Sequence, residues 1–259
     1  MPSRISIKKR FSLASKHYDE HAVVQNNISH ELSGLVDNGY YENVLEIGTG
    51  TGSLTGFLTS KIDFKNFFSL DISHRMIGMA RKKFKHVHFF VADGEEIPTI
   101  SRFDLIATSS TLQWFLNPKE SMPDLFNLFD KQPKLFADKD GIFLFSAFVK
   151  GTFKELIEAV EKTGFGSYFP LRDSSFYLRI IEKFLNIECY YEKSYDIYYK
   201  TAMDFLKSIK MTGANYTLNK NPKRSNFFEF LRFIDDNFRE DGKIKITYKS
   251  LFVRAKNHQ

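Results

Sequence analysis

The 259-residue chain has little of what marks a secreted or membrane protein. Its one cysteine, Cys189, cannot form an internal disulfide bond, which favours a reducing compartment. No run of residues approaches the roughly 18 consecutive apolar residues of a membrane-spanning helix. The basic segment 1–11 is not followed by the apolar stretch of a secretion signal. These absences predict a cytoplasmic protein with no membrane partner.

The sequence also has no internal repeat, no low-complexity segment and no linker rich in proline or glycine. Single α/β domains of roughly 200–250 residues are common, so we expect one domain over 1–259 and a monomer. Within it we expect four parts: N-terminal helices at 1–36, a ligand-binding core at 40–150, a helical lid with one edge strand at 151–240, and a final antiparallel strand at 243–256.

Apolar runs and helical patterns alternate along the first two thirds of the chain. The patterns predict strands at 44–47, 66–70, 88–92, 103–108, 141–148, 187–199 and 243–256. They predict helices at 3–15, 19–36, 52–61, 75–84, 121–136, 152–163, 173–184, 201–211 and 225–238. Such alternation is typical of an α/β fold with a doubly wound, mostly parallel sheet, here of seven strands, whose ligands bind at the carboxyl ends of the strands.

A glycine-rich segment, Glu46-Ile47-Gly48-Thr49-Gly50-Thr51-Gly52, directly follows the first predicted strand. Glycines there allow a tight turn and let a ligand approach the backbone closely. The spacing is Gly-x-Gly-x-Gly and differs from the dinucleotide fingerprint. Taken alone, the segment is equally typical of a sharp strand-to-helix turn.

Two aspartates strengthen the interpretation of the glycine-rich segment as part of a ligand site. Asp71 ends the second predicted strand, where a carboxylate can accept hydrogen bonds from both ribose hydroxyls. Asp93 ends the third strand, where it can accept from an adenine amino group. Each aspartate could be only a helix cap or turn residue. Their joint position predicts an adenosine site, and a carboxylate at the sugar argues against NADP.

Over about residues 40–150 this pattern resembles the class I methyltransferases that depend on S-adenosylmethionine (SAM) and release S-adenosylhomocysteine. The resemblance implies a Rossmann-like fold. It implies that Glu46 helps to hold the amino group of SAM, Asp71 the ribose and Asp93 the adenine. The full set of cofactor residues implied is Tyr18, Gln25, Glu46, Gly48, Thr49, Gly50, Gly52, Asp71, Ile72, Met76, Asp93, Gly94, Ser109 and Gln113.

Further segments resemble the malonyl-acyl carrier protein O-methyltransferase family of biotin synthesis. They are Phe11-x-x-Ala14-x-x-His17-Tyr18-x-x-His21-Ala22-x-x-Gln25, Leu112-Gln113-Trp114, Phe148-x-x-Gly151-x-Phe153-x-Glu155-Leu156, Leu206-Lys207-x-x-Lys210-x-x-Gly213-Ala214 and Tyr248-x-x-Leu251-Phe252. The departures are a threonine-rich glycine loop and Ser109, where the family often has asparagine. The resemblance implies methyl transfer from SAM to the free carboxylate of a malonyl thioester on a carrier protein or on coenzyme A.

A carboxylate is already ionised at neutral pH, so the reaction needs no general base. We expect Tyr18 to position the acceptor. Candidate acceptor-binding residues are Trp114, Phe148, Phe169, Arg172, Phe176 and Lys210. The aromatic residues are equally typical of core packing, and single basic residues are usually solvated.

The net charge of +6 favours an acidic partner. The family resemblance implies an acidic acyl carrier protein, and we expect no nucleic-acid partner because Ser109-Ser110-Thr111-Leu112 does not resemble a base-flipping loop. His17 and His21 share a helical spacing but lack a third ligand, so we expect no metal. Three alternatives stay open: methylation of a free small acid or quinone precursor, methylation of nucleic acid, and SAM binding without turnover.

Overall fold

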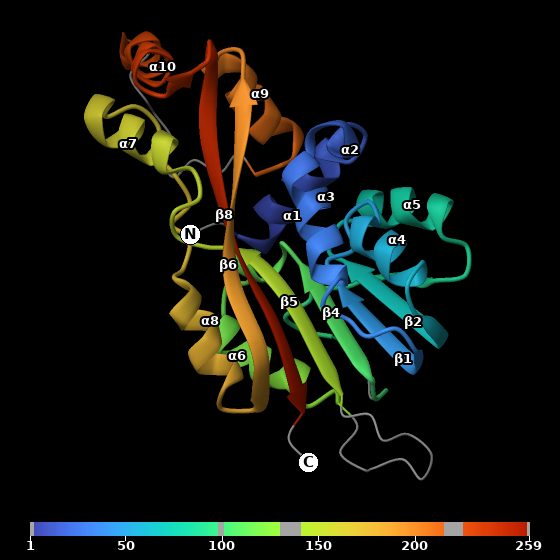
Figure 1. Ribbon diagram of the computed structural model, residues 1–259. Helices are drawn as coiled ribbons and strands as arrows, with labels where there is room; N and C mark the ends of the chain where they lie inside the picture. The colour runs from blue at the N-terminus through green and yellow to red at the C-terminus, as the bar shows by residue number, and fades with distance from the viewer. Residues whose placement is uncertain (1–2, 98–100, 130–140, 215–224, 258–259) are drawn as a thin grey trace.

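The computed structural model describes residues 3–97, 101–129, 141–214 and 225–257 (Figure 1). Its helices are α1 (Arg4–Ala14), α2 (Tyr18–His21), α3 (Val23–Ser33), α4 (Ser53–Thr59), α5 (His74–Lys83), the 3-10 helix η1 (Leu112–Trp114), α6 (Pro118–Phe126), α7 (Lys154–Thr163), α8 (Ser174–Ile181), α9 (Ala202–Met211) and α10 (Ser225–Asn237). Its strands are β1 (Tyr40–Ile47), β2 (Asp63–Asp71), β3 (His88–Val91), β4 (Leu105–Ser109), β5 (Ile142–Phe148), β6 (Leu185–Tyr199), β7 (Arg239–Glu240) and β8 (Lys243–Asn257).

Seven of these strands form the sheet in the order β3-β2-β1-β4-β5-β8-β6. The first five are parallel, while β8 runs antiparallel to both β5 and β6. The predicted doubly wound, mostly parallel sheet is confirmed, and the two-residue β7 adds a short pairing with β8. The chain order reverses between β1 and β4, so their carboxyl ends flank the crevice where such folds bind ligands.

Helices cover both faces of the sheet (Figure 1). On one face α3, α4 and α5 bury apolar side chains such as Ile28, Leu58 and Ala80. On the other face α6 and α8 bury Met122 and Ile181 in a second cluster. Every residue of β5 is buried, as expected for a central strand covered on both sides.

The antiparallel pair β6 and β8 extends beyond the rest of the sheet. Strand β5 pairs only with residues 250–256 of β8, so the pairing of β8 residues 244–249 with β6 continues past it. Helices α7, α9 and α10 pack around this extension (Figure 1). Helix α8, which the sequence analysis assigned to the lid, instead packs against α6 on the sheet face because Tyr177, Ile180 and Ile181 are buried there.

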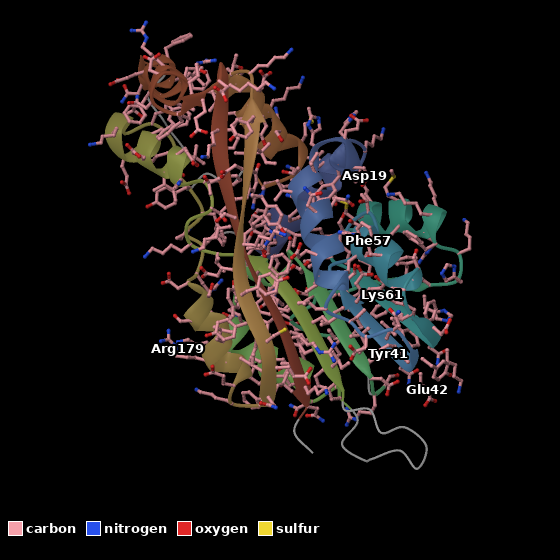
Figure 2. The ribbon with its side chains drawn as sticks, viewed as in Figure 1. Asp19, Tyr41, Glu42, Phe57, Lys61 and Arg179 are labelled. Carbon is pink, nitrogen blue, oxygen red and sulfur yellow. The ribbon has the colours of Figure 1, made fainter. Side chains whose placement is uncertain are left out.

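The N-terminal region differs from the prediction in one respect. The helix expected at 19–36 is two helices, because Ala22 has a non-helical backbone (φ −87°, ψ 37°). This break turns α2 over the glycine loop, where Asp19 (labelled in Figure 2) pairs with Lys83 of α5 at 2.6 Å and accepts a hydrogen bond from Thr51. The helix expected at 121–136 begins earlier, at Pro118, and ends at Phe126; the predicted range 130–136 lies outside the described residues.

None of the helices in the described parts of the chain combines the length and apolar character needed to cross a membrane.

Candidate functional site

The glycine loop lies between β1 and α4 and is held from two sides. The backbone amides of Gly48 and Thr49 donate to the Leu70 carbonyl at 2.8 and 2.9 Å, which fixes the loop to the end of β2. Gly48 has φ +77°, and a Cβ atom there would lie 2.0 Å from the Thr111 hydroxyl oxygen. Only glycine therefore lets the loop pass so close to the turn that follows β4.

Asp71, at the carboxyl end of β2, faces this loop. Its Oδ2 accepts a hydrogen bond from the Gly50 amide at 3.0 Å, and its Oδ1 accepts from the Ser73 amide at 2.7 Å. Burial raises the pKa of Asp71 to about 6, although both hydrogen bonds oppose the shift. The carboxylate thus orders the loop and can still accept hydrogen bonds from a ligand.

Asp93, which follows the end of β3, makes contacts with helix α1. Its Oδ2 lies 2.9 Å from Nε of Arg4, and its Oδ1 accepts from the Glu95 amide at 3.0 Å. Arg4 also pairs with Glu96 at 2.6 Å. We call this ion-pair group the α1 clasp, and it holds α1 across one end of the crevice.

A cavity, here called the loop cavity, opens between the glycine loop, the ends of β2, β3 and β4, and helix α1. The predicted cofactor residues that line it are Tyr18, Gly48, Gly50, Asp71, Ile72, Met76, Asp93, Gly94 and Ser109. The cavity is also lined by Arg4, Ile7, Phe11, Ile47, Leu70, Glu95 and Phe115, which were not predicted. Ser110 and Thr111, of the segment that the resemblance implies near the sulfonium, and Trp114, predicted for the acceptor, line it too. The helical pattern at 3–15 predicts α1 but carries no signal that the helix crosses the crevice.

Three residues assigned to the cofactor lie behind the loop instead. The Glu46 side chain is buried below β1, and its Oε2 accepts hydrogen bonds from the hydroxyls of Thr55 at 2.5 Å and Ser69 at 2.9 Å. Burial raises the pKa of Glu46 to about 7. Thr49 bonds to the Thr55 hydroxyl, and Gly52 packs beside Phe84. These residues support the loop from beneath, and none of the three lines the loop cavity.

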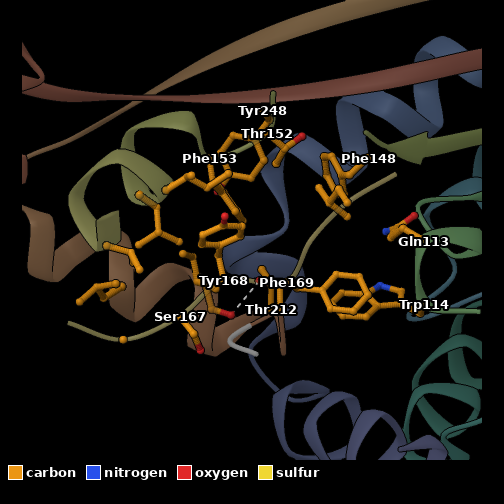
Figure 3. A pocket seen from close by; sticks show the side chains of 18 of the residues that line it. Gln113, Trp114, Phe148, Thr152, Phe153, Ser167, Tyr168, Phe169, Thr212 and Tyr248 are labelled. Carbon is orange, nitrogen blue, oxygen red and sulfur yellow. Dashed lines mark hydrogen bonds between the residues drawn. The ribbon is translucent and has the colours of Figure 1, made fainter. Parts of the chain in front are cut away.

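A second cavity of about 250 Å³ lies between the sheet edge and the extension (Figure 3). We call it the aromatic cavity. Its lining comes from α7, α9, α10, η1 and the segment 165–171, together with residues of α1, α2, α3, β5 and β8. It includes the predicted residues Gln25, Gln113, Trp114, Phe148 and Phe169. The Trp114 and Phe169 rings stack with centroids 5.3 Å apart, and Phe11 meets Trp114 edge-on at 5.5 Å.

The two cavities adjoin, because Phe11, Tyr18, Ser110 and Trp114 line both. Gln25 and Gln113, predicted to bind the cofactor, line only the aromatic cavity. Burial, and then the negative charges of Asp71 and Asp19, raise the pKa of Tyr18. Its hydroxyl is therefore a hydrogen-bond donor at the junction at any physiological pH.

No Lys, Arg, His, Asp or Glu side chain is among the described residues that line the aromatic cavity. Arg172, Phe176 and Lys210, predicted to bind the acceptor, do not line this cavity, and their role in acceptor or carrier binding stays a prediction. The Arg172 guanidinium lies over the Phe176 ring at 5.0 Å and donates to the Phe115 carbonyl at 3.4 Å, outside the cavity. Lys210 is exposed on α9, since the buried Phe205 and Ile209 occupy the inner face of that helix.

Within the described ranges, no three His, Cys, Asp or Glu side chains are placed to hold a metal ion.

Comparison with known proteins shows which families and folds the chain is similar to. A model of the methyltransferase domain matches residues 44–128. Over 95% of the chain and 94% of the relative, the sequence is 31% identical to a malonyl-[acyl-carrier protein] O-methyltransferase of Priestia megaterium. It is also 31% identical, over the whole of both chains, to malonyl-[acyl-carrier protein] O-methyltransferase 2 of Ilyobacter polytropus. The fold is similar to that of BH2331 from Bacillus halodurans, with a TM-score of 0.62, 16% identity, and coverage of 90% of this chain and 99% of that one.

Proposed function

Because the chain belongs to the malonyl-[acyl-carrier protein] O-methyltransferase family, we propose that it esterifies the free carboxylate of a malonyl group carried as a thioester on an acyl carrier protein. The chain is an enzyme of the SAM-dependent methyltransferase class. The observation that carries the proposal is the shared wall of the two cavities at Tyr18, Ser110 and Trp114. A methyl donor in the loop cavity and an acceptor in the aromatic cavity would meet there.

The residues of the loop cavity fit SAM. The Asp71 carboxylate can accept from the ribose hydroxyls, and Asp93, which lines the cavity beside Arg4, can accept from the adenine amino group. Gly94 lets the chain after β3 pack closely against the cavity wall, because a Cβ there would lie 2.7 Å from the Ile47 side chain and 3.1 Å from the Phe115 ring. When bound, SAM supplies an electrophilic methyl group on a positively charged sulfur.

The chain's own residues then need only to orient and desolvate the acceptor. A carboxylate oxygen forms a bond to the methyl carbon as the bond between carbon and sulfur breaks, so no proton is transferred. The reaction therefore requires no acid–base pair in the aromatic cavity. The Tyr18 hydroxyl donates to the acceptor, and the aromatic walls exclude water and strengthen this hydrogen bond.

Three further assignments belong to the same proposal. The net charge of +6 favours an acidic carrier protein. We also propose that the protein acts as a monomer and in the cytoplasm. Sedimentation and cell fractionation would test the last two.

A comparison of acceptors tests the function. Malonyl-carrier protein, malonyl-coenzyme A and free malonate are each incubated with the protein and SAM, and formation of S-adenosylhomocysteine is followed. We expect the highest kcat/KM with the carrier protein, and no turnover with acetyl-carrier protein, which has no carboxylate. Equal kcat/KM for all three acids would favour a methyltransferase of free small acids.

A further inference from the structure

The turn after β4 has an unusual conformation where the two cavities meet. Ser110 has φ +52°, the left-handed region that residues with a side chain rarely adopt. Two hydrogen bonds hold this conformation: the Ser110 amide donates to the Ser146 carbonyl at 2.9 Å, and Nε2 of Gln113 donates to the Ser110 carbonyl at 2.7 Å. Strain maintained in this way is typical of residues with a functional role.

The Ser110 hydroxyl is buried and has no hydrogen-bond partner among the described residues. The neighbouring Ser109 differs, since its hydroxyl accepts from Ser29 at 3.1 Å and from Ser146 at 3.2 Å. Burying an unpaired hydroxyl costs about 1–3 kcal/mol. Because Ser110 lines both cavities, a ligand at their junction would satisfy this group.

The acceptor of the proposed function is an anion, yet no described residue with a charged side chain lines the aromatic cavity. A carboxylate buried there needs hydrogen-bond donors. We propose that the Ser110 hydroxyl donates a hydrogen bond to the acceptor carboxylate and positions it towards the loop cavity. This inference rests on the proposed function and adds the residue that recognises the carboxylate.

Gln113 supports this assignment. A carbonyl oxygen can only accept, so the amide nitrogen of Gln113 must face Ser110, and its Oε1 points elsewhere. Oε1 is buried without a partner in the described structure, and Gln113 is one of the residues that line the aromatic cavity. Since this oxygen repels a carboxylate, the acceptor carboxylate is disfavoured beside Oε1. It is favoured beside the hydroxyls of Ser110 and Tyr18. A neutral hydroxyl also orients the carboxylate without neutralising the nucleophilic oxygen.

The test compares the binding of malonyl-carrier and acetyl-carrier proteins, both in the presence of S-adenosylhomocysteine. The variants are Ser110→Ala, which keeps Cβ, and Ser110→Gly, which also relieves the strained backbone. The matched control is Ser33→Ala, a buried serine of α3 that bonds to the His30 carbonyl and lines neither cavity.

We expect both Ser110 variants to bind the malonyl-carrier protein about 10- to 100-fold more weakly, as for loss of a hydrogen bond to a charged group. Their affinities for acetyl-carrier protein and for S-adenosylhomocysteine should equal those of the wild type and of the control.

An equal loss of affinity for both carrier proteins would indicate a structural role and overturn the inference. Weaker binding of S-adenosylhomocysteine would assign the hydroxyl to the cofactor and also overturn it. A wild-type protein that methylates malonyl-carrier protein, with variants that bind it normally, would reject this inference alone. A wild-type protein without preference for the malonyl group would reject the proposed function and the inference together.

Discussion

At the scale of single residues, Asp71 is the group whose environment most directly links the fold to ligand binding. Its carboxylate accepts two backbone hydrogen bonds and is buried at the floor of the loop cavity. Replacement of Asp71 by Ala would remove the acceptor of the ribose hydroxyls and release the Gly50 amide. We expect the affinity for S-adenosylhomocysteine to fall at least about 100-fold, measured by calorimetry.

The pKa of Asp71, about 6, gives the same interaction a pH dependence. Ribose hydroxyls donate to the ionised carboxylate, so ligand binding favours that form. We expect the dissociation constant to increase below pH 6, by up to about tenfold per pH unit. Asp71→Asn should bind weakly with no such slope, whereas Asp63→Asn, an exposed change on the same strand, should behave as wild type. A wild-type affinity that stays constant from pH 7 to pH 5 would contradict the assignment.

Glu46 provides a stability prediction. Its pKa is about 7 in the folded protein, while an exposed glutamate titrates near 4.5. Between these values the folded protein holds a proton that the unfolded chain has released, so the free energy of unfolding decreases as the pH rises through this range. Glu46→Gln keeps an oxygen for Thr55 and Ser69 but does not titrate. Between pH 5 and pH 8 we expect Glu46 to lower the free energy of unfolding of the wild type by up to about 3 kcal/mol, and we expect the variant to lack this contribution. Urea unfolding at the two pH values measures it. The account of Glu46 fails if the variant keeps the slope of the wild type.

At the scale of elements, the strands and the glycine loop were predictable because their patterns are local. An apolar run such as Ile142–Phe148 and a capping serine such as Ser73 determine an element largely by themselves. The packing of α1 and α8 was not predictable in this way. Phe176 was a candidate for the acceptor site, yet it belongs to α8, which packs against α6 because its buried face matches that side of the sheet. The resemblance implies that the segment 108–113 lies near the sulfonium, but it gives Ser110 no role of its own, because neither its left-handed backbone nor its unpaired hydroxyl has a sequence signal.

The α1 clasp is an element whose role can be measured. Arg4 joins α1 to Asp93 and Glu96 across the loop cavity, so ligand release requires that these contacts loosen. Because the pairs are partly exposed, each contributes at most about 1 kcal/mol. We expect Arg4→Ala to increase the dissociation rate of S-adenosylhomocysteine several-fold in stopped-flow measurements. Arg239→Ala removes a comparable exposed pair, with Asp235, and should leave the rate unchanged. An unchanged rate in Arg4→Ala would show that α1 does not limit release.

At the scale of the whole molecule, the net charge of +6 acts on a protein partner over a longer range than on a small acceptor. Salt screens such attraction, with a Debye length of about 10 Å at 0.1 M. We expect kcat/KM for malonyl-carrier protein to fall as ionic strength rises, mainly through KM, and that for S-malonyl-pantetheine to change little. Equal salt dependence of the two acceptors would indicate that the carrier protein itself is not attracted by the enzyme.

The loop cavity and the aromatic cavity share Tyr18, Ser110 and Trp114, and no described residue that lines the aromatic cavity is charged. The central claim of the proposal is that the methyl group is transferred to the free carboxylate of the carried acyl group. The most direct measurement is tandem mass spectrometry of malonyl-carrier protein after incubation with the enzyme and SAM bearing a deuterated methyl group. The account predicts one deuterated methyl group per carrier, bonded to the distal carboxyl oxygen of the malonyl group. Absence of label on the carrier, or label on any protein side chain instead, would contradict it.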